Sequence, residues 1–283
     1  MTYLITGATG DVGSKVVNHL LQRGHRPRVF VRNAEKAQAL FGDRVDIFVG
    51  DLGEPASLRS ALEGVDELFL VNSGPQIPVL DELAAKAARA AGVRHLVKLS
   101  SMDVQHGLAI GAWHELGEAA IRASGISFTF VQPTGFMSNL LAWAKSIKTE
   151  GIVRASTGEG RRAFIHSEDI AAVATAALTM PEYGGDSLPI TGPEALTFAE
   201  ATARIASAIG KGLRFQPISD QEAGQRYSVV SGSVAETEAH VLLWRAIREG
   251  RLATVTDNVE RILGRKPIQL DQWAIENAAA FCR

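Results

Sequence analysis

The chain has 283 residues, of which 46% are hydrophobic and 21% charged, and its formal net charge is −2. This balance is typical of a globular protein and excludes disordered and low-complexity chains. It also gives no overall positive field that would indicate nucleic acid or an acidic membrane as a partner. The one cysteine, Cys282, cannot form an internal disulfide or a CxxC metal clip, and no signal peptide or bilayer-long apolar run is visible. We therefore expect a cytoplasmic monomer or homodimer without a metal site.

The first 135 residues alternate short apolar runs with amphipathic stretches. The runs are apolar on both faces, which is typical of strands buried in a parallel sheet. Strands are predicted at 3–6, 28–31, 45–49, 67–71, 95–99 and 127–131. Helical patterns lie between them, as where Val12, Val16 and Leu20 share one face before Gly24. The repeated strand–helix order predicts an α/β fold with a doubly wound parallel sheet.

After Thr134 helical patterns dominate. Short strands are expected near 152–155, 163–165, 187–190 and 213–216. Helices are expected over about 137–148, 168–180, 197–209, 234–249, 256–263 and 270–281. We predict two lobes: a sheet-bearing core from 1–135 and about 152–180, and a smaller, mainly helical, substrate-side lobe from about 136–151 and 181–283.

A glycine motif, TGATGDVG at residues 6–13, follows the first predicted strand and opens the first predicted helix. A dinucleotide motif requires this context. Gly7 would permit the tight turn, Gly10 would let backbone N–H groups approach a pyrophosphate at the positive end of the helix dipole, and Gly13 would let the helix pack on the sheet. A purely structural turn is the alternative, because the spacing is GxxGxxG instead of GxGxxG. The motif predicts a Rossmann-type, NAD(P)-binding core whose cofactor site contains Gly7, Thr9, Gly10, Asp11, Val12 and Gly13.

The second predicted strand ends at Arg32, where NAD-selective proteins usually place an acid for the ribose 2′-hydroxyl. An arginine fork suits a 2′-phosphate instead. Lys36, Arg26 and Arg28 add further positive charge nearby, against a single acid. The sequence therefore predicts NADP(H) in preference to NAD(H), with Arg32 and Lys36 in the cofactor site. Simple solvation of a strand end by these cations is the alternative.

The later strand ends would meet at the same carboxyl edge of the sheet, where ligands bind in open α/β folds. Asp51 would accept a hydrogen bond from the adenine amino group or would cap the following helix, and both readings stay open. Gly74, which has no side chain, would allow the second ribose to approach. The strand-end residues predicted for the cofactor site are Asp51, Leu52, Asn72, Ser73, Gly74, Ser100, Gln132, Pro133 and Thr134.

Six segments along nearly the whole chain carry a family resemblance. They are TGATGDVG at 6–13, LSSMDV at 99–104, WHELGEAAIRASGISFTFVQPTGFMSNL at 113–140, FIHSEDIAAVA at 164–174, LPITGPEALTFAE at 188–200 and VERILGRKP at 259–267. In these segments the chain resembles the NmrA-like group of atypical short-chain dehydrogenase/reductases, in particular its quinone reductase and triphenylmethane reductase branch. The resemblance implies an NADPH-dependent oxidoreductase. Because the group also contains inactive regulators, a non-catalytic NADP(H)-binding redox sensor is the alternative.

The chain departs from ordinary short-chain dehydrogenases, which use a tyrosine and a lysine four residues later to protonate a carbonyl oxygen. No lysine follows any of the three tyrosines at that spacing, and His114 and Glu118 occupy the two places on the corresponding helix. Reduction of a simple ketone needs such an acid, which is typically worth about 10²–10⁴-fold. A quinone-like, enone or iminium acceptor delocalises or cancels the charge that arrives with hydride. The sequence therefore predicts direct hydride transfer to a conjugated, electron-poor small molecule.

His114 is the predicted catalytic residue, because an imidazole can supply a proton or orient an acceptor oxygen. A helix residue paired with Glu118 is the alternative for this histidine. Aromatic and apolar bulk near the same helix would suit a flat acceptor. The predicted substrate pocket consists of Met102, Trp113, Phe136, Met137 and Trp143, with ordinary core between the lobes as the alternative.

Overall fold

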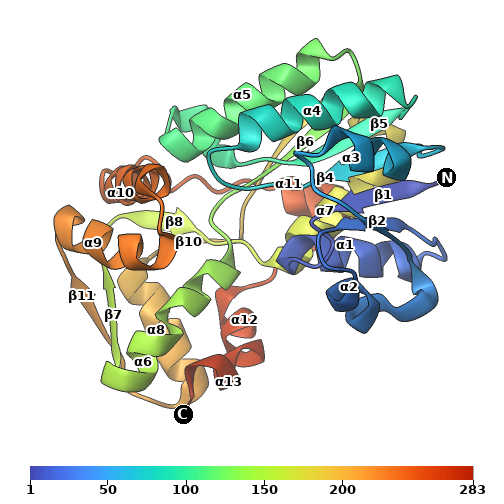
Figure 1. The fold of residues 1–283 in the computed structure, drawn as a ribbon. Helices are drawn as coiled ribbons and strands as arrows, with labels where there is room; N and C mark the ends of the chain where they lie inside the picture. Colours follow the sequence, from blue (N-terminus) through green and yellow to red (C-terminus); the bar gives the residue numbers. More distant parts are fainter. Residues whose placement is uncertain (283) are drawn as a thin grey trace. The chain divides into compact units, whose positions relative to one another are not determined.

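The computed structural model describes residues 1–282, which form two compact units. The first unit consists of Met1–Ser101, Trp113–Gln132 and Ile170–Leu188. The second consists of Met102–Ala112, Pro133–Asp169 and the chain from Pro189 onward. Figure 1 shows that the chain passes between them repeatedly. Residues 152–169, expected in the sheet-bearing core, belong here to the second unit, and the predicted division into functional domains stays a prediction.

The first unit is built around a seven-stranded sheet with the order β3-β2-β1-β4-β5-β6-β9. Its strands are β1 (Tyr3–Thr6), β2 (Arg28–Val31), β3 (Asp46–Val49), β4 (Glu67–Leu70), β5 (His95–Leu99), β6 (Ser127–Pro133) and β9 (Ser187–Ile190). Strands β1 to β6 pair in parallel. Strand β9 lies beside β6, where Phe130 N donates to Asp186 O and Thr134 N donates to Ile190 O. Because both residue numbers increase together, these two strands are also parallel. The predicted α/β fold with a doubly wound parallel sheet is confirmed.

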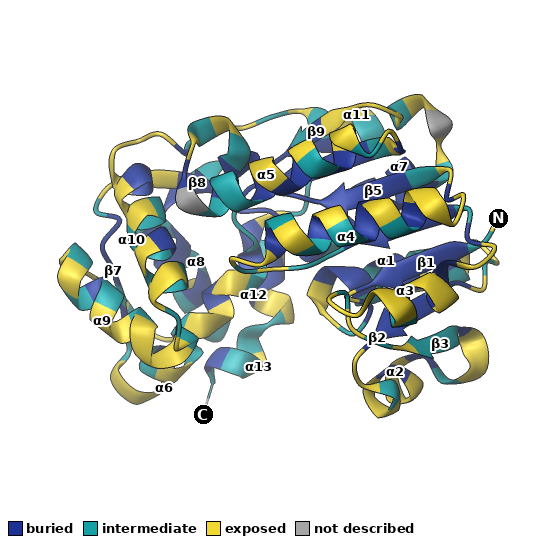
Figure 2. Cartoon of the chain, turned by 45° about the horizontal axis from the view of Figure 1, so that its top comes forward, coloured by how far each residue is buried: buried dark blue, intermediate teal, exposed yellow. Residues whose placement is uncertain are grey.

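Helices cover this sheet because successive residues of each strand point to opposite faces. Leu4 and Leu68, which are partners in the β1–β4 register, pack with Leu96 in one core cluster that also includes residues of α3, α4 and α5. The helices of the sheet unit are α1 (Asp11–Gln22), α2 (Ala34–Phe41), α3 (Pro55–Leu62), α4 (Ile77–Ala90), and all but the first residues of α5 (Ala109–Ala123) and α7 (Ser167–Thr179). Figure 2 shows buried strands behind helices α4 and α5, whose outer faces are exposed.

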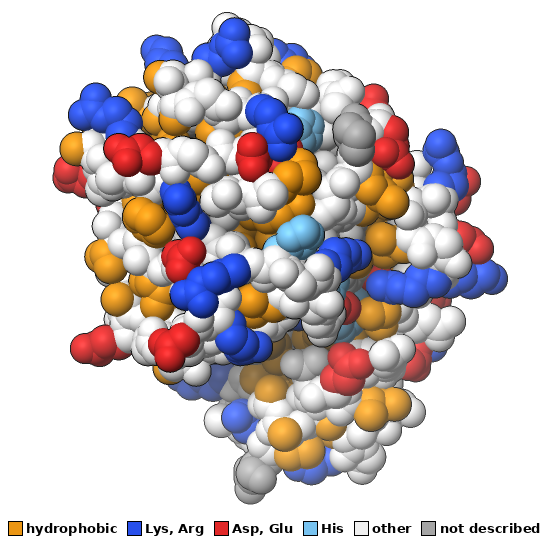
Figure 3. Space-filling model, turned by 90° about the vertical axis from the view of Figure 1, so that its right-hand side faces the viewer, with side chains coloured by type: hydrophobic (Ala, Val, Ile, Leu, Met, Phe, Trp, Pro, Cys, Tyr) orange, Lys and Arg blue, Asp and Glu red, His pale blue; other side chains and the backbone are white. Residues whose placement is uncertain are grey.

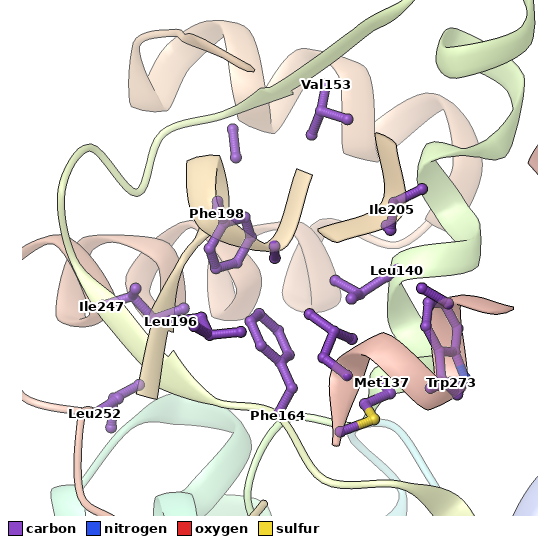
Figure 4. Packing of buried hydrophobic residues seen from close by; sticks show 14 of the residues in the cluster. Met137, Leu140, Val153, Phe164, Leu196, Phe198, Ile205, Ile247, Leu252 and Trp273 are labelled. Atoms are coloured by element: carbon purple, nitrogen blue, oxygen red, sulfur yellow. The ribbon is translucent and has the colours of Figure 1, made fainter. Parts of the chain in front are cut away.

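The second unit has its own hydrophobic core. Its strands form two small sheets, β10 (Ala195–Thr197) with β8 (Arg161–Ala163) and β11 (Arg214–Pro217) with β7 (Ile152–Ala155). Its helices are α6 (Ala144–Glu150), α8 (Phe198–Ile209), α9 (Asp220–Ser231), α10 (Val234–Arg248), α11 (Asn258–Leu263), α12 (Leu270–Glu276) and α13 (Ala278–Phe281). Figure 4 shows Phe164 pointing toward Phe198 in this core, with ring centroids 5.6 Å apart.

Three local features of the second unit differ from expectation. Helix α9 was not predicted, because it has no apolar stripe and Ala223 is its one buried residue. Ser219 caps the start of this helix, where its side chain accepts a hydrogen bond from Glu222 N. The helix expected over 270–281 is divided at Asn277, whose backbone is not helical. The helix expected over 137–148 begins as a 3₁₀ segment, Met137–Trp143. Local pattern therefore located the last two helical regions but not their ends, and it missed α9.

Within residues 1–282, no helix combines the length and apolar character needed to cross a bilayer. The same part of the chain contains no group of three or more His, Cys, Asp or Glu residues placed to hold a metal ion. Figure 3 shows positive and negative side chains interspersed on the face that it presents.

Glu67 provides a test of burial in the sheet. Its side chain is buried at the start of β4, and this burial raises its pKa from 4.5 to about 7, although Arg94 lies 3.9 Å away and opposes the shift. A carboxyl group with a raised folded-state pKa loses stability as the pH rises from its unfolded-state pKa to its folded-state pKa. Glu67→Gln should therefore increase the free energy of unfolding near pH 8 by about 1–3 kcal/mol and change it little near pH 4.

Urea unfolding at the two pH values measures this effect. The matched control is Glu63→Gln, which changes an exposed carboxyl group at the end of α3. If both variants showed the same pH dependence as the unaltered protein, the proposed burial cost at Glu67 would be wrong.

Candidate functional site

A cleft of about 490 Å³ opens at the carboxyl ends of the strands in the first unit. Four segments form it: the glycine loop after β1, the end of β2 with the start of α2, the turn after β3, and the turn after β4. The lining residues are Thr6, Gly7, Thr9, Gly10, Phe30, Val31, Arg32, Lys36, Gly50, Asp51, Leu52, Val71, Asn72, Ser73 and Leu80. Segments far apart in sequence therefore converge at the edge where a nucleotide was expected.

Backbone contacts shape the glycine loop. Gly7 has φ +59°, in the left-handed region that favours glycine, and Gly10 N donates to Gly7 O at 2.9 Å. A Cβ at Gly13 would lie 2.3 Å from Gly7 O, so α1 passes directly against the loop. Gly10 is the N-cap of α1 and no side chain caps this helix. The start of α1 is therefore not occupied by a capping side chain, and a helix N-terminus of this kind is where proteins bind phosphate groups.

Two cations at the cleft are free to meet an anion. Arg32 and Lys36 are both exposed and line the cleft. Within residues 1–282, neither side chain forms a hydrogen bond or an ion pair with another group. In contrast, Arg26 is paired with Asp46 at 2.8 Å, and Arg28 donates to Glu63 O at 2.6 Å. Only the first pair of cations therefore suits the extra phosphate of a phosphorylated dinucleotide.

Phe30, Gly50 and Asp51 form the part of the cleft between β2 and β3. A Cβ at Gly50 would lie 2.6 Å from the Phe30 ring, so the ring rests on the backbone there. The Asp51 carboxylate accepts from Gly53 N at 2.8 Å, whereas Glu54 is the N-cap of α3. The expectation that Asp51 caps this helix is therefore wrong, and its contact with an adenine stays a prediction.

The cleft includes only part of the predicted cofactor set. The predicted residues that line it are Gly7, Thr9, Gly10, Arg32, Lys36, Asp51, Leu52, Asn72 and Ser73. The predicted residues that do not line it are Asp11, Val12, Gly13, Gly74, Ser100, Gln132, Pro133 and Thr134. Sequence reasoning missed Thr6, Phe30, Val31, Gly50, Val71 and Leu80. Most of these adjoin a predicted residue at a strand end, but Leu80 comes from helix α4 and no strand-end rule would find it.

A buried carboxylate joins the ends of β5 and β6 to helix α5. Glu118 Oε1 accepts from Ser100 Oγ at 2.6 Å and from Gln132 Nε2 at 2.8 Å. Its other oxygen lies 3.3 Å from the Arg122 guanidinium. Ser100 and Gln132 therefore serve this network, and their contact with a cofactor stays a prediction.

A second buried carboxylate lies behind the cleft wall. Asp81 of α4 and Lys98 of β5 are both completely buried, with Oδ2 and Nζ 2.5 Å apart. Asn72 Nδ2 donates to the other Asp81 oxygen at 2.7 Å. Burial raises the pKa of Asp81 and lowers the pKa of Lys98, while their mutual attraction opposes both shifts. The lysine within the apolar strand was the sequence signal for this pair, because a buried lysine needs a partner.

His114 is buried on α5 and is neutral at pH 7. Burial, together with the positive charge of Lys98, lowers its pKa to about 3. Its Nδ1 atom is buried with no hydrogen-bond partner within the described residues, and no hydrogen bond there joins it to Glu118. The expected pairing of His114 with Glu118 is therefore not found. A neutral ring can donate one hydrogen bond but cannot act as an imidazolium acid.

The predicted substrate residues differ in exposure. Met137 is 1% exposed within the core of the second unit, and Trp143 packs against that core with its ring 5.5 Å from Phe198. Met102 is buried beside a void of about 10 Å³, which is room for roughly one water molecule. Met137 thus has almost no surface to offer a ligand, whereas Trp113 and Phe136 keep partial exposure. The substrate pocket stays a prediction.

Known proteins resemble this chain in sequence and in fold. Residues 7–181 match the family model described as NAD(P)H-binding. A (4-alkanoyl-5-oxo-2,5-dihydrofuran-3-yl)methyl phosphate reductase of Streptomyces griseus is 39% identical over 98% of each chain, and an NAD(P)H azoreductase of Xenophilus azovorans is 36% identical over 98% of each chain. The structure of an NADPH-dependent quinone oxidoreductase of Escherichia coli, complexed with NADPH, matches with a TM-score of 0.88 and 25% identity, covering 98% of this chain and 99% of that one.

The contact between α1 and the glycine loop can be tested by one added methyl group. Gly13→Ala places a Cβ against Gly7 O, so the helix must move away from the loop. We expect a loss of about 1–3 kcal/mol in the free energy of unfolding, measured in urea. Gly212→Ala is the matched control, because nothing lies within 4 Å of a Cβ at that position. Equal stabilities of the two variants would contradict the close approach.

Proposed function

This chain belongs to the NAD(P)H-binding, NmrA-like group of atypical short-chain dehydrogenase/reductases, and from that premise we propose that it uses NADPH to reduce a conjugated, electron-poor small molecule by direct hydride transfer. It is an NAD(P)H-dependent reductase of the quinone and azo reductase kind. The proposal concerns three finer points: the preference for the phosphorylated cofactor, the class of acceptor, and the absence of a protein acid.

The preference for NADPH rests on the two unpaired cations. The diphosphate of a dinucleotide would lie against the glycine loop and the uncapped start of α1. Arg32 and Lys36, at the end of the neighbouring strand, would then hold the 2′-phosphate, which NADH lacks. Arg26 and Arg28 are engaged elsewhere and would contribute little. This contrast between free and engaged cations is the observation that carries the cofactor proposal.

The proposed acceptor class rests on the side chains near the end of β5 that could donate a proton to the acceptor. When bound, NADPH supplies a hydride ion, and the acceptor must take up the charge that arrives with it. Ser100 donates to Glu118, His114 is neutral, and Lys98 is held by Asp81. Each of these side chains is neutral or engaged within the protein, so we infer that the acceptor itself delocalises the charge and takes its proton from water.

The named acceptors of the relatives support this class. An alkanoyl-oxodihydrofuran, an azo compound and a quinone all contain conjugated double bonds that spread an added electron pair. In such a reaction the protein works mainly by holding the acceptor in position. His114 would orient an acceptor atom through one hydrogen bond, and Trp113, which is half-buried one residue before it, would offer a face for stacking.

The cofactor proposal is tested by charge reversal at the cleft. Arg32→Glu should raise the Kd for NADPH by about tenfold or more and change the Kd for NADH by less than about threefold. Thermal stabilisation at several ligand concentrations gives both constants, since a ligand of the native state stabilises it in proportion to ln(1 + [L]/Kd). Arg59→Glu, an exposed reversal on α3, is the matched control. Equal binding of NADPH and NADH by the unaltered protein would remove the case for Arg32.

The role of His114 is tested on a panel of naphthoquinones. His114→Ala should lower kcat/KM by less than about 100-fold, because charge delocalisation in the acceptor carries most of the step. With a pKa near 3, His114 stays neutral between about pH 5 and pH 8. Its protonation should therefore cause no change in kcat/KM over that pH range.

Two results would redirect these conclusions. A larger loss in His114→Ala, with a titration near neutral pH that disappears in the variant, would make His114 a general acid. NADPH binding without turnover of any acceptor would favour a non-catalytic redox sensor.

A further inference from the structure

The buried Asp81–Lys98 pair has no part in the proposed hydride transfer, yet it adjoins the cofactor cleft. Both side chains are 0% exposed. Burying two ions costs desolvation, and replacement of such pairs by apolar residues is often neutral or stabilising. Stability alone therefore explains the pair poorly, and the groups that it holds in place are the better guide to its role.

One such group belongs to the cleft wall. Asn72 Nδ2 donates to Asp81 Oδ1 at 2.7 Å, a hydrogen bond that the negative charge strengthens. Asn72 lines the cleft together with Val71 and Ser73, and Leu80, the neighbour of Asp81, lines it as well. Asp81 is thus joined to the wall by the hydrogen bond from Asn72 and, along the chain, by the preceding residue Leu80.

The other end of the same wall is fixed by the glycine loop. Val71 N donates to Thr6 Oγ1 at 2.7 Å. A Cβ at Gly7 would lie 3.0 Å from Val71 Cβ, so the two segments are in contact. Residues 71–73 are therefore held between the loop expected to bind the diphosphate and the buried carboxylate.

Helix α5 holds the carboxylate from a further direction. A Cβ at Gly117 would lie 2.0 Å from Asp81 Oδ2, so the helix backbone rests directly against the ion. With Lys98 at 2.5 Å from the same oxygen, Asp81 has little freedom to move. Only a small residue at position 117 permits this arrangement.

We propose that Asp81 and Lys98 are positioning residues that fix residues 71–73 as the wall of the cleft, through the side chain of Asn72, and thereby increase the affinity for NADPH. Lys98 supplies the counter-charge that allows Asp81 to stay ionised in the interior. Neither residue touches the cofactor. The inference rests on the proposed function, because it assumes that the cleft holds NADPH.

The double variant Asp81→Leu/Lys98→Met removes the ions but keeps an apolar interior of similar size, so the fold should persist. The Kd for NADPH should rise by about tenfold, the factor that one lost hydrogen bond to a charged group is worth. Circular dichroism and urea unfolding confirm the fold. The matched control is Glu82→Leu/Lys86→Met, which removes an exposed ion pair of the same charge types from the same helix.

A cycle with Asn72→Leu separates positioning from general damage. Asn72→Leu alone should weaken NADPH binding by a similar factor. In the background of Asn72→Leu, the double replacement should cause no further loss, because its effect passes through that side chain. Additive losses, or unchanged NADPH affinity in Asp81→Leu/Lys98→Met, would overturn the inference.

Gly117→Ala provides an independent test that keeps both ions, should the double variant not fold. The added methyl group displaces the Asp81 carboxylate, so NADPH affinity should fall while the helix remains. Unchanged affinity would count against the inference. Failure of the unaltered protein to bind NADPH would instead remove the proposed function, so the two failures are distinguishable.

Discussion

The cleft depends on one steric contact, the passage of helix α1 against the backbone of the first turn. Gly13 allows the helix to reach Gly7, and Gly7 in turn allows Val71 to approach from the neighbouring strand. Any larger residue at these positions would separate the elements that meet there. Because the sheet order places β1 between β2 and β4, this glycine loop lies between the two walls of the cleft.

The buried charges at the sheet edge are organised around two carboxylates with different partners. Glu118 is satisfied mainly by neutral donors, Ser100 and Gln132, whereas Asp81 is satisfied by an amine and an amide. Both carboxylates are engaged by groups of the protein itself. Under the proposed function, these networks would orient groups near the cofactor, and the acceptor would need little proton assistance from the protein.

The sheet and the glycine loop could be predicted because their signals are local: apolar runs on a strand period and glycines at fixed spacing. Arg32 could be predicted because it ends a strand. The contribution of Leu80 could not, since it depends on which turn of α4 reaches the cleft. The Asp81–Lys98 pair joins helix α4 to strand β5, and which residues of these two elements face each other depends on how they pack. Met137 was expected at a pocket, but hydrophobicity alone does not distinguish a pocket wall from a core.

The charged groups of the sheet unit lie in two very different dielectric surroundings. Arg32 and Lys36 are exposed, so dissolved ions screen them over a Debye length of about 8 Å at physiological ionic strength. Asp81 and Lys98 are sealed from solvent and are screened far less. Added salt should therefore weaken the attraction of Arg32 and Lys36 for an anion while leaving the shape of the cleft intact. Ionic strength would then tune how strongly the cleft binds a phosphorylated ligand, without any change of conformation.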